Sequence, residues 1–417
     1  MKNNKLGKYS FGVGDRFAHQ AEAQLNAFQK AKSRGADITP VWNKSYREHT
    51  IIKSKPEQTR QEADKAVKQL NWESAYFVDA DHVNAGSVGF FLDSSDFFTL
   101  DVADFIGTEA AADDISAFVS ANREYLGTLK IPEIKETFDV DETRLTAIAL
   151  KYLNAVLEAG KTYRRIKSEK NGSNFIVEVS MDETDMPQSP LEIFFILSAL
   201  RWDGVPVDTL APKFSGRFNK GVDYVGDLAL FRKEFEQDLA VISFAISEFA
   251  FSPELKLSIH SGSDKFSLYP VIKQAINRAD TGLHIKTAGT TWLEELIGLA
   301  LAGGDGLQIA QEIYRRALER YDELCSPYAT VIDINKSNLP PVETVNSWPG
   351  MKFASVLRHD QSSADYNPDV RQLLHVGYKI AAEMGDQFLH ALKTYEDTIA
   401  EQVTTNIFER HMKPLYL

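Results

Sequence analysis

The sequence has 417 residues, of which 43% are hydrophobic and 25% are charged, so it can bury a large core and is typical of a globular protein. Its net charge of −13 argues against nucleic acid as a partner, because a phosphate backbone is bound by a basic surface. The single cysteine, Cys325, excludes an internal disulfide and a cysteine-rich zinc site, and is consistent with a reducing compartment.

No targeting or membrane segment is evident. The N-terminal residues include lysines but lack the apolar stretch of a signal peptide. The longest apolar run, Ile193–Leu200, is far shorter than the roughly 20 residues that cross a bilayer. The sequence therefore predicts a cytoplasmic protein without a membrane partner.

In the first half of the chain, short apolar runs alternate with longer helical patterns. Strands are predicted at residues 10–14, 38–43, 75–81 and 97–103. Helices are predicted at residues 18–35, 56–70, 113–126 and 142–167. A loop, rather than a clear helix, joins the third strand to the fourth.

The second half repeats this rhythm more regularly. Strands are predicted at residues 175–183, 208–214, 255–260 and 283–289. Helices follow them at residues 190–202, 226–249, 265–277 and 290–303. Pro190 lies in a first turn, where helices favour proline, whereas Pro270 indicates a short or broken helix.

Eight strand–helix units predict a TIM-like α/β fold, a (β/α)8 barrel formed by residues 1–303. A doubly wound open sheet would give the same local pattern, but the count of eight favours the barrel. Residues 304–417 show mostly helical patterns. We therefore expect a helical C-terminal extension packed on the barrel.

Ionisable and polar residues gather where the predicted strands end. In a TIM barrel the carboxyl ends of the strands form the active site, so these residues would share one rim. Such a density of charge is costly in a core and useful in a site. The residues at these ends are Asp15, Arg16, Asn43, Lys44, Asp79, Asp81, His82, Asp101, Glu178, Ser180, Asp182, Lys213, His260, His284 and Lys286.

The histidines of this rim are candidate ligands for a divalent metal such as zinc, manganese or nickel. His82 and His260 end their strands directly, and His284 shares strand parity with Lys286, so all of them can face one cup. A lone histidine is more often structural than a ligand. His375 lies in a helical context and is the reserve candidate, although a core role suits it better.

Two carboxylates are candidate proton handlers. Asp81, beside His82, can be a general base, a metal ligand or a helix cap. Glu178 lies among apolar residues within a strand, where burial should raise its pKa and let it hold a proton for delivery. The alternative for Glu178 is a structural ion pair with a lysine.

Several cationic and capping groups suit an acidic sugar. The loop from His260 to Lys265 offers backbone N–H groups, hydroxyls and a lysine near a helix start, although an ordinary capped turn would look the same. Lys286 and Arg16, with Asp15 beside it, complete the predicted substrate-binding set. The Gly12–Asp15 segment lacks the third glycine of a dinucleotide fingerprint.

Seven blocks of the sequence together resemble the tagaturonate epimerase family. They run in the family's order and cover roughly residues 9–380. Members of the family can have a sizeable segment ahead of the first block, and this sequence starts nearly at that block. The blocks are Ser10–Arg16, Asp79–Val83, Glu178–Pro190, Lys220–Leu228, Leu257–Pro270, His284–Thr290 and Asp369–Tyr378.

The resemblance implies a metal-dependent isomerase that interconverts tagaturonate and fructuronate. It implies that Asp81 accepts a proton, that Glu178 donates one, and that His82 and His260 bind the metal. His284 is the choice for a third ligand, with His375 as the alternative. The partner would be a ketohexuronate or a ketohexose, and a homo-oligomer is left open.

The two sugars differ at a hydroxyl-bearing carbon β to the ketone, which enolisation alone cannot invert. A retro-aldol route fits: Asp81 takes the hydroxyl proton, the C–C bond breaks, the aldehyde half rotates, and the bond forms again with Glu178 handling protons. The competing hypotheses are a fructose/tagatose 4-epimerase, a Schiff-base aldolase using Lys213 or Lys286, and a non-catalytic sugar-acid binding protein.

Overall fold

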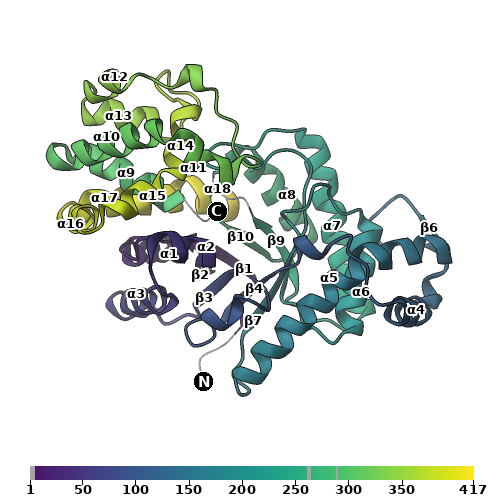
Figure 1. Cartoon of the computed structure of the whole chain (residues 1–417). Coiled ribbons are helices and arrows are strands. Elements are labelled where there is room, and N and C mark those ends of the chain that lie inside the picture. Colours follow the sequence, from purple (N-terminus) through teal and green to yellow (C-terminus); the bar gives the residue numbers. More distant parts are fainter. Residues whose placement is uncertain (1–4, 261–263, 288–289) are drawn as a thin grey trace.

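The computed structural model describes residues 5–260, 264–287 and 290–417, and its centre is a closed barrel of parallel strands (Figure 1). Around the barrel the order is β1-β10-β9-β8-β7-β4-β3-β2, and β1 pairs with both β2 and β10, which closes the sheet. The strands are β1 (Tyr9–Gly14), β2 (Ile38–Ser45), β3 (Phe77–Val83), β4 (Phe97–Asp101), β7 (Ile176–Ser180), β8 (Thr209–Ala211), β9 (Lys256–His260) and β10 (Leu283–Lys286).

This topology confirms the TIM-like barrel, and all eight predicted strands are present. The closed ring excludes the open doubly wound sheet. As predicted, a loop joins β3 to β4, and it contains only the short 3-10 helix η1 (Val88–Phe90).

The helices that follow the other strands surround the barrel (Figure 1). Pro270 does not break α8 but lies in its first turn, where a missing N–H costs nothing. A small hairpin of β5 (Gly127–Leu129) and β6 (Phe138–Val140) precedes the longest helix. The helices are α1 (Ala21–Ser33), α2 (Tyr46–Ile52), α3 (Pro56–Gln69), α4 (Ala112–Ala121), α5 (Glu142–Glu169), α6 (Pro190–Trp202), α7 (Leu228–Glu248), α8 (Tyr269–Ala279) and α9 (Thr290–Ala302).

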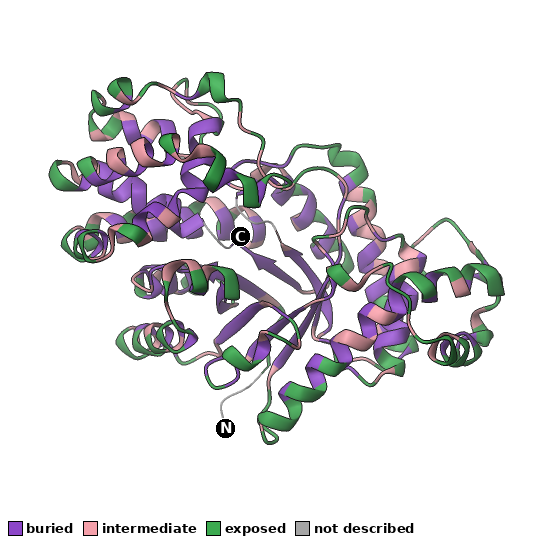
Figure 2. Ribbon diagram, in the orientation of Figure 1, coloured by how far each residue is buried: buried purple, intermediate pink, exposed green. Residues whose placement is uncertain are grey.

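The barrel interior has an apolar level and a polar level. The apolar level is a cluster separate from the main core, made of Leu6, Val41, Phe77, Phe97 and Ile176. Two residues further along the same strands, side chains of the same parity are polar, namely Asn43, Asp79, Thr99 and Glu178. Figure 2 shows the barrel strands as almost wholly buried. The polar level therefore lies under the C-terminal rim, closed off from solvent on the other side by apolar packing.

After α9 the chain is helical and packs on one side of the barrel (Figure 1). Helix α17 contacts α9 and α1, and α18 contacts α8, so these helices cover the barrel's own helices. The segment consists of α10 (Gly304–Glu319), α11 (Tyr321–Cys325), η5 (Ser326–Tyr328), η6 (Lys336–Asn338), α12 (Val342–Asn346), α13 (Gly350–Leu357), α14 (Pro368–Val376), α15 (Tyr378–Met384), α16 (Asp386–Thr394), α17 (Glu396–Thr405), the π-helix η7 (Asn406–Met412) and α18 (Lys413–Tyr416).

A buried ion pair ties this helical segment to the loop after β9. The Arg371 guanidinium on α14 donates to Asp264 Oδ2 at 2.7 Å, and both side chains are completely buried. His359 and His411 lie 3.2 and 3.1 Å from the same carboxylate. Asp264 thus joins three separate parts of the helical segment to the barrel.

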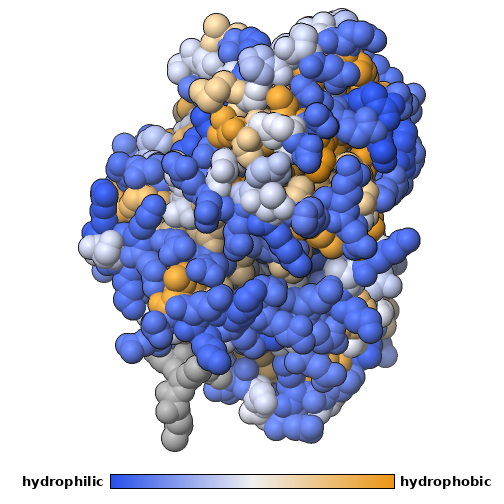
Figure 3. Space-filling view, turned by 90° about the vertical axis from the view of Figure 1, so that its left-hand side faces the viewer, coloured by the Kyte–Doolittle hydropathy of each residue, from blue (hydrophilic) through white to orange (hydrophobic). Residues whose placement is uncertain are grey.

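The molecular surface seen in Figure 3 is mostly hydrophilic, and its hydrophobic patches are interrupted by hydrophilic residues. Of the helices in the described part of the chain, none is both long and apolar enough to cross a membrane.

The Asp264–Arg371 pair gives a test of how the helical segment is held. We expect Arg371→Met to destabilise the protein by about 3–5 kcal/mol, because it leaves the buried Asp264 carboxylate without its guanidinium. Denaturant titration followed by circular dichroism measures this. Lys379→Met, which removes a surface ion pair with Glu323, is the control and should cost less than about 1 kcal/mol. Equal stability of the two variants would contradict the structural role of the pair.

Candidate active site and metal centre

A cavity of about 920 Å³ lies at the carboxyl ends of the barrel strands. Its volume suits a small polar metabolite. It is lined by residues from β3, the loops after β1, β7 and β8, the ends of β9 and β10, and the helical segment. Among the lining residues are Arg16, Glu48, Asp81, His82, Asp101, Asp182, Lys213, Lys220, His260, Lys286, Tyr328, His375 and Tyr378.

A local irregularity in β3 directs two consecutive side chains into this cavity. In a regular strand Asp81 and His82 would point to opposite faces. Here the pairing with β4 shifts register between Ala80 and Val83, and His82 has a φ of 52°, which is uncommon for a residue other than glycine. Both side chains therefore line the cavity, with His82 Nδ1 2.8 Å from Asp81 Oδ1. Strained backbone of this kind is often found at functional sites.

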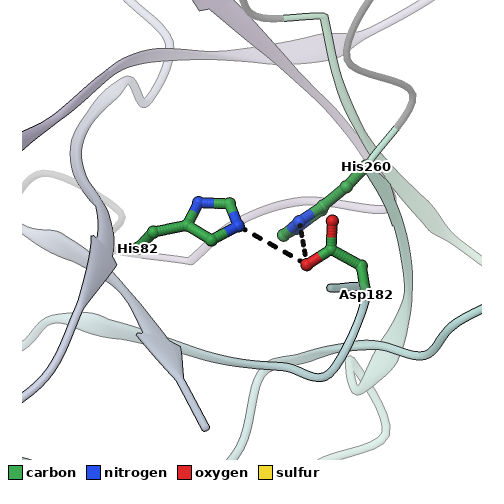
Figure 4. A group of neighbouring side chains, drawn as sticks. All are labelled: His82, Asp182 and His260. Atoms are coloured by element: carbon green, nitrogen blue, oxygen red, sulfur yellow. Dashed lines mark ion pairs between the residues drawn. The ribbon is translucent and has the colours of Figure 1, made fainter. Parts of the chain in front are cut away.

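His82, Asp182 and His260 point toward one another and form the candidate metal group (Figure 4). Asp182 Oδ1 lies 3.4 Å from His82 Nε2 and 3.2 Å from His260 Nδ1. The potential ligand atoms of the group all lie within 4.8 Å of one another. His82 Nε2 is buried and makes no hydrogen bond within the described part of the chain. Two imidazoles and a carboxylate are a donor set that suits zinc, manganese or nickel, so these residues fit a divalent ion.

Both histidines are held in carboxylate surroundings. Burial opposes the charge of His260, but Asp182 and Glu178 outweigh it and raise the pKa of His260 to about 9. Burial likewise opposes the charge of His82, and Asp81 with Asp182 raises the pKa of His82 well above its ordinary value. In the metal-free protein at neutral pH, the two imidazoles are therefore protonated.

The Lys286 ammonium connects the carboxylates beneath the metal group. Its Nζ lies 2.8 Å from Asp79 Oδ2, 2.9 Å from Asp81 Oδ1 and 2.9 Å from Glu178 Oε1. It also donates to the Thr99 hydroxyl. Gly12 leaves room for this lysine, since a Cβ at that position would lie 3.1 Å from Lys286 Cγ.

The three carboxylates differ in their pKa. Burial raises the pKa of Asp79 to about 7 although Lys286 opposes it. Burial acts in the same direction on Asp81, but Lys286 and His82 outweigh it and lower the pKa of Asp81. The expectation for Glu178 is wrong: burial favours a raised pKa, but Lys286 and His260 hold the pKa of Glu178 well below its ordinary value.

Glu178 nevertheless occupies a central position. It is completely buried on β7, with Oε1 2.7 Å from His260 Nε2. The hydroxyls of Thr99 and Thr209 donate to its two oxygens at 3.1 and 2.7 Å. Glu178 is therefore paired with a lysine, as the structural alternative predicts. It also contacts His260, a candidate metal ligand, so it remains a candidate site residue.

Three predicted site residues lie away from the cavity wall. His284 is buried inside the barrel, where its Nδ1 is 2.9 Å from Ser10 Oγ and its ring contacts Phe97. Asp15 accepts backbone N–H groups of His19 and Gln20. The Lys265 ammonium donates to the carbonyls of Asn219 and Val222. The rest of the predicted anion loop, residues 261–263, lies outside the described residues.

Other residues of the site were not selected from the sequence. Asp182 is among the predicted strand-end residues, and it follows Glu178 and Ser180 at strand parity, but the sequence does not single it out as a ligand. Asp79 was likewise noted only as a strand end. Lys220 and Tyr378 gave no signal beyond their membership of the family-like blocks, because only the fold brings them to the barrel rim.

A closed (β/α)8 barrel with carboxylates, imidazoles and a lysine around a rim cavity is the architecture of a barrel enzyme with a small-molecule active site. The chain belongs to the tagaturonate epimerase family, whose model matches residues 2–415, and it is an isomerase.

Relatives of known identity agree with this membership. The chain is 31% identical over 426 residues to the tagaturonate/fructuronate epimerase of Thermotoga maritima, an alignment that spans 97% of this chain and 80% of that protein. It is similar to two crystal structures of the fructuronate-tagaturonate epimerase UxaE from Cohnella laeviribosi. The native one has a TM-score of 0.80 at 25% identity and covers 99% of this chain and 82% of its own. The form with one glycerol has a TM-score of 0.79 at 26% identity, and the match covers 98% of this chain and 81% of that chain.

The raised pKa values of His82 and His260 predict that metal binding displaces protons. A metal must replace the imidazole protons, so affinity should increase as pH rises toward about 9 and fall at lower pH. Calorimetric titration with Mn²⁺ at pH 7, in buffers of different ionisation enthalpy, should show about one proton released per imidazole. In His82→Asn that release should fall by about one proton. Binding without proton release would mean that these histidines are not ligands.

Proposed function

We propose that this protein interconverts tagaturonate and fructuronate with the help of a divalent metal held by His82, Asp182 and His260. The observation that carries the proposal is the contact between this group and the buried Asp81–Lys286–Glu178 cluster. A metal group alone would suffice for binding a sugar. Its direct contact with two linked proton-handling carboxylates suits a reaction that removes and returns a proton.

Inversion at the carbon β to the ketone requires that a bond to that carbon break. Asp81 lines the cavity and is held as a carboxylate, so it takes the proton of the β hydroxyl. The C–C bond between the α and β carbons then breaks, giving an aldehyde and an enediolate. After the aldehyde turns its other face, the bond forms again and the new alkoxide takes up a proton.

Lys286 links the residues that handle these protons. Its ammonium contacts both Asp81 and Glu178 at 2.9 Å, so it can pass a proton between the two carboxylates. Glu178, ionised at rest by Lys286 and His260, receives its proton through this contact before donating it. Its role as donor thus does not need the raised pKa that the sequence predicts.

When bound, a divalent metal would supply Lewis-acid polarisation of the substrate carbonyl. Asp182 takes the place of the third ligand in this proposal, because it lies between the two histidines whereas His284 bonds to Ser10. His375 also lines the cavity but does not belong to the group.

A Schiff-base aldolase that uses Lys286, one of the two lysines considered for that role, is less well supported. Such a mechanism needs a neutral amine, but Asp79, Asp81 and Glu178 outweigh the effect of burial and hold the pKa of Lys286 well above its ordinary value. Borohydride reduction with substrate should therefore leave Lys286 unmodified.

The deciding experiment is an NMR assay of the purified protein with tagaturonate, fructuronate, fructose and tagatose, each with chelator and with added Mn²⁺, Zn²⁺ or Ni²⁺. We expect metal-dependent interconversion of the two uronates. Full activity after chelation and dialysis would refute the proposed metal dependence. Conversion of only the neutral ketoses would show that the substrate is a ketose and not a uronate.

The two carboxylates give a second test. Asp81→Asn and Glu178→Gln should each lower kcat by about 10²–10⁴, because each removes a proton-transfer group, while one metal ion still binds. Steady-state kinetics and Mn²⁺ titration measure the two quantities. Asp280→Asn, which changes a carboxylate exposed on the surface, should behave as the unmodified protein does. Near-normal rates in either site variant would contradict its assigned role.

A further inference from the structure

A second set of residues lines the same cavity: two cations, a histidine whose ring nitrogens are unpaired among the described residues, and a tyrosine that stacks on one of the cations. Arg16 follows β1, and Lys220 lies in the loop between β8 and α7. His375 is on α14, and Tyr378 begins α15. Two of these four residues therefore come from the helical segment that follows the barrel.

Arg16 is held in a fixed orientation with one donor left over. Its Nε donates to Glu48 at 2.9 Å, and its guanidinium stacks 4.4 Å from the ring centre of Tyr378. Glu48 is itself fixed by the capping box that starts α2 at Ser45. The Nη1 atom of Arg16 is buried and has no hydrogen-bond partner among the described residues. A guanidinium nitrogen of this kind costs free energy until an acceptor reaches it.

His375, like Arg16, is buried and has unpaired nitrogen atoms among the described residues. Its side chain is buried against the cavity, and neither ring nitrogen has a partner in the described ranges. Burial, followed by the charges of Arg16 and Lys220, lowers the pKa of His375 well below its ordinary value, so the ring is neutral and can donate one N–H.

Lys220 completes the positive field. Its ammonium lies 5.8 Å from the ring centre of Tyr328, and within the described residues it has no ion-pair partner. Burial, followed by the repulsion of the Arg16 charge, lowers the pKa of Lys220, and both side chains line the same cavity. An anion between them would relieve this repulsion and satisfy the free donors.

Building on the proposed function, we propose that Arg16, Lys220 and His375 bind the carboxylate of the uronate substrate. The sequence assigns this role to Arg16, Lys265 and Lys286. Of these, Lys286 is occupied by three protein carboxylates. The carboxylate site is therefore separate from the metal group and distinguishes a uronate from a neutral ketose.

The carboxylate site would also hold one of the two fragments that form when the substrate is cleaved. When the bond between the α and β carbons breaks, its electron pair goes to the enediolate half, and the β carbon becomes the aldehyde of a three-carbon acid. That acid carries the carboxylate. A carboxylate anchor therefore retains the half that must rotate before the electron pair attacks its other face.

The test is Lys220→Met, which keeps the aliphatic stem and removes the charge. We expect KM for tagaturonate to rise about tenfold or more, with kcat changed much less, because a contact made in both ground and transition states is lost. Lys379→Met is the matched control: Lys379 follows Tyr378 in the chain, but its ammonium pairs with Glu323 on the surface. An unchanged KM in Lys220→Met, or a fall in kcat alone, would overturn the proposal.

A further readout separates anchoring from general damage to the site. NMR of the reaction mixture should show released dihydroxyacetone and three-carbon aldehyde acid in Lys220→Met and His375→Leu, but not in the unmodified protein. His375→Gln, which keeps an N–H donor, should restore retention at least in part. If the unmodified protein binds tagaturonate more tightly than tagatose by calorimetry yet epimerises neither, the proposed function fails while the carboxylate site stands. If it epimerises tagaturonate and the Lys220→Met and His375→Leu variants release no fragments, the anchoring role fails alone.

Discussion

The buried ammonium of Lys286 is the interaction on which the rest of the site depends. Three carboxylates, Asp79, Asp81 and Glu178, lie within 2.9 Å of it at the polar level of the barrel. Without a cation Asp81 and Glu178 could not stay ionised in a closed interior, because an unpaired buried charge is far more costly than a paired one. Glycine at position 12 on the neighbouring strand leaves room for the lysine side chain. One cation thus both permits the buried charges and connects the two carboxylates to which proton transfer is assigned in the proposed mechanism.

The charge balance above Lys286 explains why the metal group suits a divalent ion. In the metal-free protein, the protonated His82 and His260 face the carboxylates of Asp81, Asp182 and Glu178. Binding of a divalent cation would remove one proton from each histidine, so two positive charges leave as two arrive. The neighbouring carboxylates keep the same total countercharge in both states. The protonation of Asp81, Lys286 and Glu178 therefore does not need to change when His82 and His260 exchange their protons for the metal.

The sequence predicts the barrel and much of the metal group because both follow from local patterns. Eight alternating units indicate the fold, and His82 and His260 end their strands, where a barrel must present them. Contacts that arise from tertiary packing could not be predicted in this way. Strand parity does not reveal the bulge that lets Asp81 and His82 face the same way, nor the three-way contact of Lys286 that reverses the expected pKa shift of Glu178. The helical pattern around His375 predicts a core residue, whereas its place in the cavity wall depends on how α14 packs against the barrel loops.

In the proposed mechanism, the site separates two demands that bond breaking and rejoining place on one cavity. Bond breaking and proton transfer need fixed geometry, and the residues assigned to them lie on or directly after β3, β7, β9 and β10. Rotation of the released aldehyde half needs space around that half together with an attachment at its far end. The proposed attachment comes from loops and from α14, outside the strands, and uses charge and hydrogen bonds to a freely rotating carboxylate. A carboxylate held in this way fixes the position of the fragment but leaves its aldehyde free to present either face. The fragment is therefore retained while the configuration at its aldehyde carbon can be inverted.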